Sequence, residues 1–271
     1  MISQRTEFTG AHGDILAARL DAPKGEIRAY ALFAHCFTCG KDVLAARRIA
    51  QGLTTHGIAV LRFDFTGIGA SGGEFANTNF SSNVADLVAA ADHLRQHFGA
   101  PALLIGHSLG GTATLAAADQ IAEARAVVTI AAPSNPGQLV GLLGSDNVAQ
   151  IEAAGEADVH LAGRPFRIKR QFLLDAAAHQ MDSKIAQLRK ALLVMHAPLD
   201  DTVDIANAMH IFTRSRHPKS FVSLDGADHL VSRKEDAAWV ANLIAAWSQR
   251  YLAAPASAAT ATHHATVPST T

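Results

Sequence analysis

Residues 102–110 read Ala102-Leu103-Leu104-Ile105-Gly106-His107-Ser108-Leu109-Gly110. The apolar run at the start predicts a strand buried on both faces, and a helical pattern follows at 109–123. Between them, Gly-x-Ser-x-Gly predicts a sharp turn with Ser108 at its apex, because only small residues fit two positions to either side. The helix leaves free N–H groups in its first turn that can hold an anion. These residues indicate a nucleophilic Ser108; the alternative is a glycine-rich turn around a buried serine.

The rest of the chain alternates short apolar runs with longer helical patterns, which is typical of a mostly parallel sheet covered by helices. Strands are expected at 2–9, 15–22, 28–35, 58–63, 101–106, 126–132, 191–196 and 219–224. Helices are expected at 42–55, 81–98, 109–123, 203–214 and 233–251. The expected fold class is α/β, with one mostly parallel eight-stranded sheet flanked by helices.

Two regions break this alternation. Residues 133–190 form an insertion far longer than the usual connection of about two to six residues, and we expect a lid or binding loop there. A hairpin is expected within it, around Gly163-Arg164-Pro165. The segment from Ala253 is rich in alanine, threonine and serine and has no charged residue, which is typical of a linker or a disordered end. We therefore expect one domain at 1–251 and a low-complexity tail at 252–271.

Composition narrows the class of protein. Hydrophobic residues make up 49% of the 271 residues and charged residues 17%, which excludes disorder for most of the chain and predicts one large core. The net charge is −1 without a basic stripe, which argues against nucleic-acid binding. No apolar run reaches the ~18 residues of a membrane span, and the start lacks the apolar segment of a secretory signal. Two cysteines are too few for a disulfide scaffold. A soluble protein of a reducing compartment, the cytoplasm, is expected.

A nucleophilic serine needs a base and an acid that orients the base, and both are expected after late strands in the order serine, acid, histidine. His229 follows the last expected strand and is the expected base. The strand before it ends in a loop with two adjacent carboxylates, Asp200 and Asp201. Position favours Asp200 as the acid, while Asp201 is suited to cap the following helix. Asp228 is a more distant candidate, and we expect it to accept hydrogen bonds from backbone amides of its own loop.

The combination of Gly-His-Ser-Leu-Gly, a late His-x-x-x-Asp-x-x-Val and a terminal Gly-x-x-His resembles the α/β-hydrolase family. More narrowly, the chain resembles the hydrolase half of bacterial proteins in which an α/β-hydrolase is fused to an OsmC-type domain. The stretches that carry this narrower resemblance are His35-Cys36-Phe37-Thr38-Cys39-Gly40-Lys41-Asp42, Arg62-Phe63-Asp64-Phe65-Thr66-Gly67-Ile68-Gly69, Asn77-Thr78-Asn79-Phe80-Ser81 and Phe221-Val222-Ser223-Leu224-Asp225-Gly226-Ala227-Asp228-His229. The likeness covers about residues 1–251. Where those fusions continue into a second domain, this chain has the low-complexity tail, so the peroxide-handling role of that domain is not carried over.

The resemblance implies the α/β-hydrolase fold and a site without cofactor or metal. It places the acid at Asp200, within the pattern that starts at His196. It also implies that the N–H groups of Phe37 and Leu109 bind the oxyanion, although Cys36 stands where a glycine is usual.

Further parts of the resemblance concern the insertion and one turn. Similar small esterases, among them feruloyl and cinnamoyl esterases, carry a lid at the position of 133–190. The pattern from Asp64 to Ser71 matches a structural turn of the family. The overlapping motif Gly67-x-Gly69-x-x-Gly72 is only a weak match to a dinucleotide-binding motif, so we interpret it as part of this turn. The insertion also has a basic group of residues that would favour acidic substrates or would form a solvated face: Arg164, Arg167, Lys169 and Arg170.

Two short motifs have competing interpretations. Cys36-x-x-Cys39 suggests redox chemistry, but no thioredoxin-like unit surrounds it, so we interpret both cysteines as small side chains packed under the loop. His93-x-x-x-His97 lacks a third metal ligand and predicts two solvated helix residues.

The expected function is a serine hydrolase that cleaves carboxylic esters, with short-chain or small aryl esters as substrates, through an acyl-enzyme intermediate. The same three residues serve thioesters and amides, so a thioesterase or amidase is an alternative. A different class of alternative is a non-catalytic accessory or binding module related to a fused OsmC-type partner domain. A small-molecule ester is the expected partner, and a homo-oligomer is left open.

Overall fold

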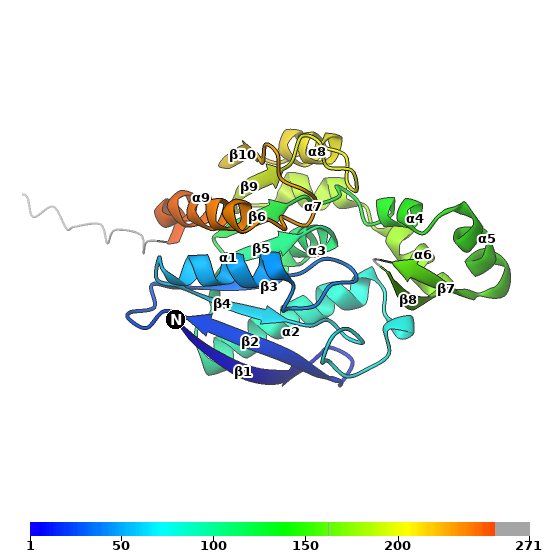
Figure 1. Ribbon diagram of the computed structural model, residues 1–271, viewed down its shortest axis with the longest axis horizontal. Helices are drawn as coiled ribbons and strands as arrows, with labels where there is room; N and C mark the ends of the chain where they lie inside the picture. The colour runs from blue at the N-terminus through cyan, green and yellow to red at the C-terminus, as the bar shows by residue number, and fades with distance from the viewer. Residues whose placement is uncertain (162, 253–271) are drawn as a thin grey trace, which may run out of the picture.

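The computed structural model describes residues 1–161 and 163–252 (Figure 1). The tail expected at 252–271 lies outside the described residues, apart from Leu252, which ends the last helix. Figure 1 shows one sheet with helices on both faces and the insertion projecting from one side. None of the helices in the described part of the chain is both long enough and apolar enough to cross a membrane.

The main sheet has eight strands in the order β1-β2-β4-β3-β5-β6-β9-β10. They are β1 (Ile2–Thr9), β2 (Ile15–Ala22), β3 (Ala29–Ala34), β4 (Ile58–Phe63), β5 (Pro101–His107), β6 (Ala126–Ile130), β9 (Ala191–His196) and β10 (Lys219–Ser223). Strand β2 runs antiparallel to β1 and β4, and the other pairs are parallel. Strands β4, β5, β6 and β9 consist entirely of buried residues, as their continuous apolar runs predict. The α/β fold class and the eight expected strands are confirmed.

Helices cover both faces of this sheet. On one face, α1 (Leu44–Thr54) and α9 (Lys234–Leu252) share a cluster of buried side chains with the strands. On the other face, α2 (Phe80–His97), α3 (Leu109–Ala117) and α8 (Ala206–Arg214) belong to a second cluster. Figure 1 shows α1 and α9 in front of the sheet and α2 behind it.

Local capping explains where two of these helices begin. Asn79 caps α2, since its side chain accepts a hydrogen bond from the N–H of Ser82 at 2.8 Å. Helix α8 begins at Ala206, three residues later than expected, and the N–H of Ala206 donates to Asp204 at 2.7 Å. The interpretation of Asp201 as the cap of this helix is therefore wrong.

The insertion at 133–190 is more structured than the sequence indicates. Its elements are α4 (Gln138–Leu142), α5 (Ser145–Ala154), β7 (Glu156–Leu161), β8 (Arg164–Lys169), α6 (Arg170–Ala178) and α7 (Met181–Gln187). The antiparallel pair β7–β8 is the expected hairpin. The helices were not expected, because short helices that bury few residues show little apolar periodicity: in α5 the buried residue is Ile151, and in α4 it is Leu139.

The parallel strands bring four loops to one edge of the sheet. Phe37 follows β3, Ser108 follows β5, Asp200 follows β9 and His229 follows β10. Because the carboxyl ends of parallel strands share an edge, these loops lie close together although they are far apart in the sequence. The insertion follows β6 and reaches the same edge (Figure 1).

Candidate active site

Ser108 lies at the turn between β5 and α3. Its backbone has φ 53° and ψ −128°, a conformation that L-residues rarely adopt. The two glycines of the pattern leave room for this turn. A Cβ atom on Gly110 would overlap the carbonyl oxygens of Ala34 and His35, and one on Gly106 would overlap the backbone of Gly110. The expected sharp turn from strand to helix is therefore present, with Ser108 at its apex.

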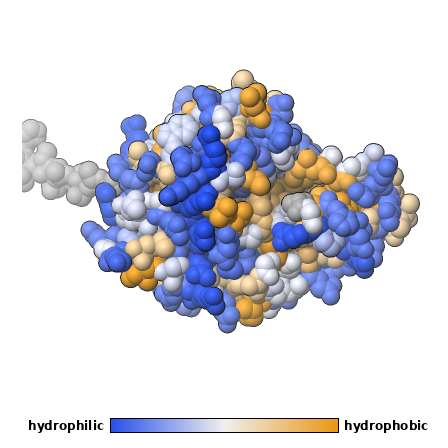
Figure 2. All heavy atoms as spheres, in the orientation of Figure 1, coloured by the Kyte–Doolittle hydropathy of each residue, from blue (hydrophilic) through white to orange (hydrophobic). Residues whose placement is uncertain are grey.

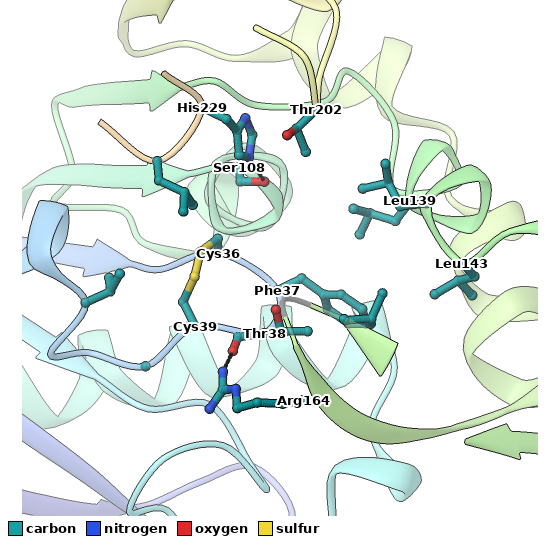
Figure 3. A pocket seen from close by; sticks show the side chains of 15 residues that line it. Cys36, Phe37, Thr38, Cys39, Ser108, Leu139, Leu143, Arg164, Thr202 and His229 are labelled. Atoms are coloured by element: carbon teal, nitrogen blue, oxygen red, sulfur yellow. Dashed lines mark hydrogen bonds between the residues drawn. A yellow bond between two sulfur atoms is a disulfide. The ribbon is translucent and has the colours of Figure 1, made fainter. Parts of the chain in front are cut away.

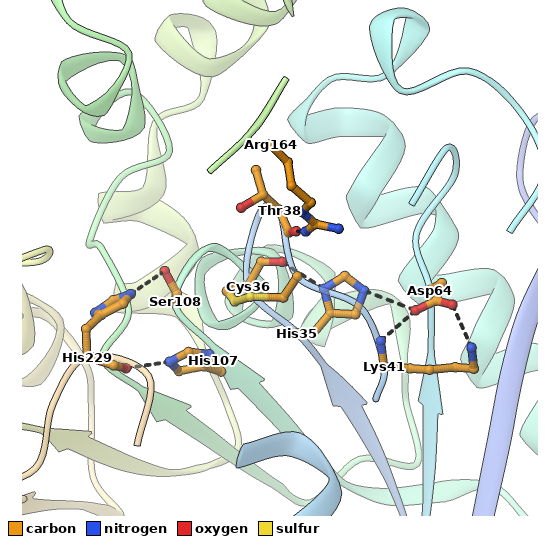
Figure 4. Close-up of a disulfide and its surroundings, with 10 residues drawn as sticks. His35, Cys36, Thr38, Lys41, Asp64, His107, Ser108, Arg164 and His229 are labelled. Carbon is orange, nitrogen blue, oxygen red and sulfur yellow. Dashed lines mark hydrogen bonds and ion pairs between the residues drawn. A yellow bond between two sulfur atoms is a disulfide. The ribbon is translucent and has the colours of Figure 1, made fainter. Parts of the chain in front are cut away.

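Ser108, His229 and Asp200 form a hydrogen-bonded chain. Nε2 of His229 lies 3.1 Å from Oγ of Ser108 (Figure 4). Nδ1 of the same ring lies 2.8 Å and 3.1 Å from the two carboxylate oxygens of Asp200. Because a carboxylate only accepts hydrogen bonds, Nδ1 carries the proton of the neutral ring and Nε2 accepts from the Ser108 hydroxyl. His229 is only 7% exposed, and the Asp200 side chain is fully buried. The arrangement can therefore move a proton from Ser108 to His229 away from bulk water.

Asp200 is held by its own loop as well as by His229. Its Oδ1 accepts hydrogen bonds from the N–H groups of Thr202 and Val203, both at 2.9 Å. Burial raises the pKa of the Asp200 carboxyl, but the hydrogen bonds from His229 and from the two amides outweigh burial and bring the pKa below its usual value. The neighbouring Asp201 is exposed and accepts from the hydroxyl of Thr202. Of the two adjacent carboxylates, it is Asp200 that reaches His229.

Two further side chains hydrogen-bond to backbone groups of the loop that holds His229. Nε2 of His107 donates to the carbonyl oxygen of His229 at 2.8 Å, and burial together with the nearby His229 lowers the pKa of His107 to about 4. Asp228 accepts from the N–H of Ser232 at 2.7 Å, so it serves backbone amides of its own loop as expected. Nothing in the sequence indicates this role of His107, because no local pattern links the residue before the serine to a partner 122 positions away.

The loop after β3 holds Phe37 and is closed by a disulfide bond between Cys36 and Cys39 (Figure 4). The interpretation of the cysteines as two separate packing side chains is therefore wrong. The physical reason is a tight turn: the N–H of Cys39 donates to the carbonyl oxygen of Cys36 at 3.1 Å, and the two Cα atoms lie 5.3 Å apart. Nδ1 of His35 also donates to the Cys36 carbonyl, at 2.7 Å. Burial lowers the pKa of His35, which keeps its ring neutral.

A buried ion pair supports the same loop from below. Nζ of Lys41 lies 2.7 Å from Oδ2 of Asp64, and the N–H of Lys41 donates to Oδ1 of Asp64 at 2.5 Å. The N–H of Ala70 donates to Asp64 at 3.0 Å, so the turn after β4 wraps around this carboxylate. Gly69 has φ +60°, and a side chain there would overlap the Asp64 carboxylate. These contacts give the glycine-rich turn a structural role and tie it to the Phe37 loop.

A cavity of about 520 Å³ opens beside Ser108 and His229 (Figure 3). Its wall is mostly apolar and includes Phe37, Val43, Leu139, Leu142, Leu143, Leu161 and Leu230. Thr38, Thr202 and the Cys36–Cys39 bond also line it, and the lining includes one arginine, Arg164. On the face shown in Figure 2, hydrophobic residues gather between the body of the molecule and the insertion.

Four phenylalanines connect the insertion to the Phe37 loop. The ring of Phe37 lies 5.0 Å from that of Phe172 in α6 and 5.5 Å from that of Phe75. The ring of Phe75 lies 4.9 Å from that of Phe166 in β8. Ring pairs at these separations contribute about 0.5–1.5 kcal/mol each beyond their buried area. The position of the insertion is thus coupled to the backbone that carries the Phe37 N–H.

The two expected oxyanion donors come from separate segments, Leu109 from the start of α3 and Phe37 from the loop after β3. Leu109 is the first residue of α3, so its N–H has no partner within the helix, and its side chain is buried. Phe37 lines the cavity together with Ser108.

The motif His93-x-x-x-His97 was expected to consist of two solvated residues, and the structure differs from this at His93. His93 is buried: its Nε2 lies 3.0 Å from Oγ1 of Thr6, and its ring stacks on Phe8. The expectation of two solvated residues is wrong for His93, because the amino-terminal strand β1 packs over it, whereas His97 is exposed. Within residues 1–161 and 163–252, no group of three or more histidine, cysteine, aspartate or glutamate residues could hold a metal ion.

The fold is that of an α/β-hydrolase, and comparison with known proteins agrees. The model of the alpha/beta hydrolase family matches residues 31–269, so the chain belongs to this family. It is similar to the crystal structure of an esterase domain from a Rhodothermus marinus protein, with 47% identity over 93% of this chain and 100% of that chain and a TM-score of 0.77.

More distant solved structures share the fold. Est1E from Butyrivibrio proteoclasticus with ferulic acid bound has 19% identity over 91% of this chain and 99% of that chain, with a TM-score of 0.80. XC6422 from Xanthomonas campestris, described as a serine hydrolase without a lid, has 21% identity over 93% of this chain and 96% of that chain, with a TM-score of 0.64. A comparison with curated proteins gives no significant match. None of these comparisons tests the narrower resemblance to the hydrolase half of OsmC-type fusion proteins, which stays a prediction.

Proposed function

We propose that this protein is a serine esterase that cleaves carboxylic esters with short-chain or small aryl groups. Ser108 is the nucleophile, His229 the general base and Asp200 the acid that orients the base. The observation that carries the proposal is the buried hydrogen-bonded chain from Oγ of Ser108 through His229 to Asp200. The similarity to an esterase domain at 47% identity supports esters as the substrate class.

In the first chemical step, Oγ of Ser108 attacks the ester carbonyl while Nε2 of His229 takes the hydroxyl proton. Asp200 stabilises the imidazolium that forms, because its carboxylate lies 2.8 Å from Nδ1. The tetrahedral intermediate then collapses: the bond to the alcohol breaks, and the alcohol leaves with the proton from His229. Water, activated by the same base, hydrolyses the acyl-enzyme and restores Ser108.

The N–H groups of Phe37 and Leu109 would bind the oxyanion of the tetrahedral intermediate. Each such donor lowers the barrier by about 3 kcal/mol in related chemistry. The disulfide and the Lys41–Asp64 pair hold the Phe37 loop in place, which would keep its N–H oriented before substrate binds. The insertion would act as a lid, since its leucines form one wall of the cavity.

The experiment that tests the proposal is intact-mass spectrometry after treatment with a fluorophosphonate probe, with wild type and Ser108→Ala compared. We expect one adduct on the wild type and none on the variant. The wild type should also hydrolyse p-nitrophenyl acetate and butyrate, while Ser108→Ala should lose at least about 10³-fold in kcat.

The other candidate functions give different results. An adduct on Ser108 with faster turnover of thioesters or amides than of matched esters would replace esterase by thioesterase or amidase. A folded wild-type protein that forms no adduct would contradict the proposal and favour a non-catalytic binding module.

A further inference from the structure

The four basic residues of the insertion have different surroundings. Arg167 makes two hydrogen bonds to the carboxylate of Asp158, at 2.9 Å and 3.0 Å. Nζ of Lys169 donates to Asn77 at 2.7 Å, and Arg170 donates to a backbone carbonyl of α5. Arg164 is the member of this group that lines the cavity with Ser108.

Arg164 is held in place through the loop of the disulfide. Its Nη2 donates to the carbonyl oxygen of Thr38, the residue before Cys39 (Figure 3). Its guanidinium also lies 5.4 Å from the centre of the Phe166 ring. These two contacts orient the side chain but do not neutralise it. No carboxylate among the described residues lies within the 4.0 Å of an ion pair with Arg164. A guanidinium has five N–H donors, so several remain for another partner.

The Arg164 guanidinium is a charged group in a cavity whose wall is otherwise mostly apolar. Leucines, phenylalanine, valine, threonines and the disulfide form the wall, and His229 is the other lining residue that can carry a charge. In Figure 3, Ser108 and His229 lie on one side of the disulfide, and Arg164 and Thr38 lie on the other. A substrate that reaches from Ser108 across the apolar wall would therefore bring its far end to Arg164.

We propose that Arg164 binds a carboxylate on the substrate, so that the preferred esters are anionic: the scissile ester lies at Ser108, an apolar spacer lies along the wall, and a carboxylate pairs with the guanidinium. The planar fork of arginine matches a carboxylate with two parallel hydrogen bonds. This proposal deepens the proposed esterase function and rests on it. The carboxylate belongs to either the acyl or the alcohol part of the ester. Kinetics on one matched pair of substrates for each part distinguish the two cases.

The test compares kcat/KM for two pairs of esters that differ in one charge. On the acyl side, the mono-p-nitrophenyl ester of adipic acid is compared with p-nitrophenyl hexanoate. On the alcohol side, 4-acetoxybenzoate is compared with 4-acetoxybenzamide. We expect the wild type to prefer the anion in at least one pair by about 10-fold, mainly through KM. The preference should shrink in 0.5 M NaCl, because Arg164 is exposed and salt screens an exposed charge.

Substitutions then assign the preference to Arg164. Arg164→Gln should abolish the preference, and Arg164→Lys should keep part of it because the charge remains without the fork. Arg167→Gln is the matched control, because it removes a guanidinium from the same strand at a position where that group pairs with Asp158. This variant should keep the wild-type preference. The ratio within each pair is the measurement, because any disturbance of the loop through Thr38 affects both esters alike.

Two results would overturn the proposal: equal kcat/KM within both pairs, or a preference for the anion that survives in Arg164→Gln. Failure of the esterase function is recognised separately. If no ester is hydrolysed, calorimetric titration of 4-acetoxybenzoate and 4-acetoxybenzamide into Ser108→Ala and into Ser108→Ala with Arg164→Gln still decides whether Arg164 holds the anion.

Discussion

Nε2 of His107 lies 2.8 Å from the carbonyl oxygen of His229. The residue before the proposed nucleophile therefore holds the backbone of the proposed base, across 122 positions of sequence. The two rings lie 5.3 Å apart, and His107 is almost completely buried, so the donor must remain a neutral imidazole with its proton on Nε2. This contact ties the position of His229 beside Ser108 to the residue that directly precedes the proposed nucleophile.

The first prediction concerns stability in mild acid. The pKa of His107 is lowered to about 4 in the folded protein, from 6.5 in the unfolded chain, so between these values the unfolded chain binds the proton and the folded protein does not. Stability is therefore complete above pH 6.5 and is lost as the pH falls towards 4. At pH 5.0 this loss is about 2 kcal/mol relative to pH 7.5. Urea unfolding at the two pH values measures it.

The control for this prediction is His107→Gln, whose side-chain amide can donate to the same carbonyl and does not titrate. The variant should lose about 2 kcal/mol less than the wild type between pH 7.5 and 5.0. Equal losses in the two proteins would show that His107 does not cause the acid sensitivity.

The second prediction uses the adjacent carboxylates. Asp200→Asn should lower kcat for p-nitrophenyl acetate by about 10³–10⁴-fold, because an amide at this position no longer stabilises the imidazolium or fixes the proton on Nδ1. Asp201→Asn should stay within about twofold of wild type, since its side chain is exposed and contacts Thr202. A comparable loss in both variants would point to a disturbed loop and contradict the specific role of Asp200.

The third prediction concerns the disulfide. Reduction with a phosphine, or the double substitution Cys36→Ser with Cys39→Ser, should lower the free energy of unfolding by about 2 kcal/mol through the closed four-residue loop. It should also lower kcat more than it raises KM, because the loop carries the Phe37 N–H that acts on the transition state. Steady-state kinetics and urea unfolding with and without reductant measure both effects. The serine variant is the control, and it should not respond to reductant.

A structural feature can be predicted from the sequence when residues close together in the chain determine it. The strands and the turn at Ser108 are specified by neighbouring residues, through continuous apolar runs and through glycines two positions from the serine. The order of late loops then places Asp200 and His229 near Ser108, because parallel strands end at a common edge. The sequence therefore predicts which side chains meet.

Other features depend on contacts that no local pattern encodes. The Cys36–Cys39 bond follows from a tight turn of the backbone. His93 is buried because a distant strand covers it. The distinct role of Arg164 within its basic group needs the packing of the hairpin against Thr38.

The fourth prediction compares two glycine-to-alanine substitutions. Gly110→Ala places a methyl group on the carbonyl oxygens of Ala34 and His35, so β3 and α3 must separate; we expect a loss of at least about 2 kcal/mol and a large fall in kcat. Gly141→Ala is the control, because a Cβ atom there has open space and the residue lies within α4; it should stabilise the protein by up to about 1 kcal/mol. Urea unfolding and p-nitrophenyl acetate hydrolysis measure both variants. A Gly110→Ala protein with wild-type stability and turnover would mean that the turn at Ser108 is looser than this packing requires.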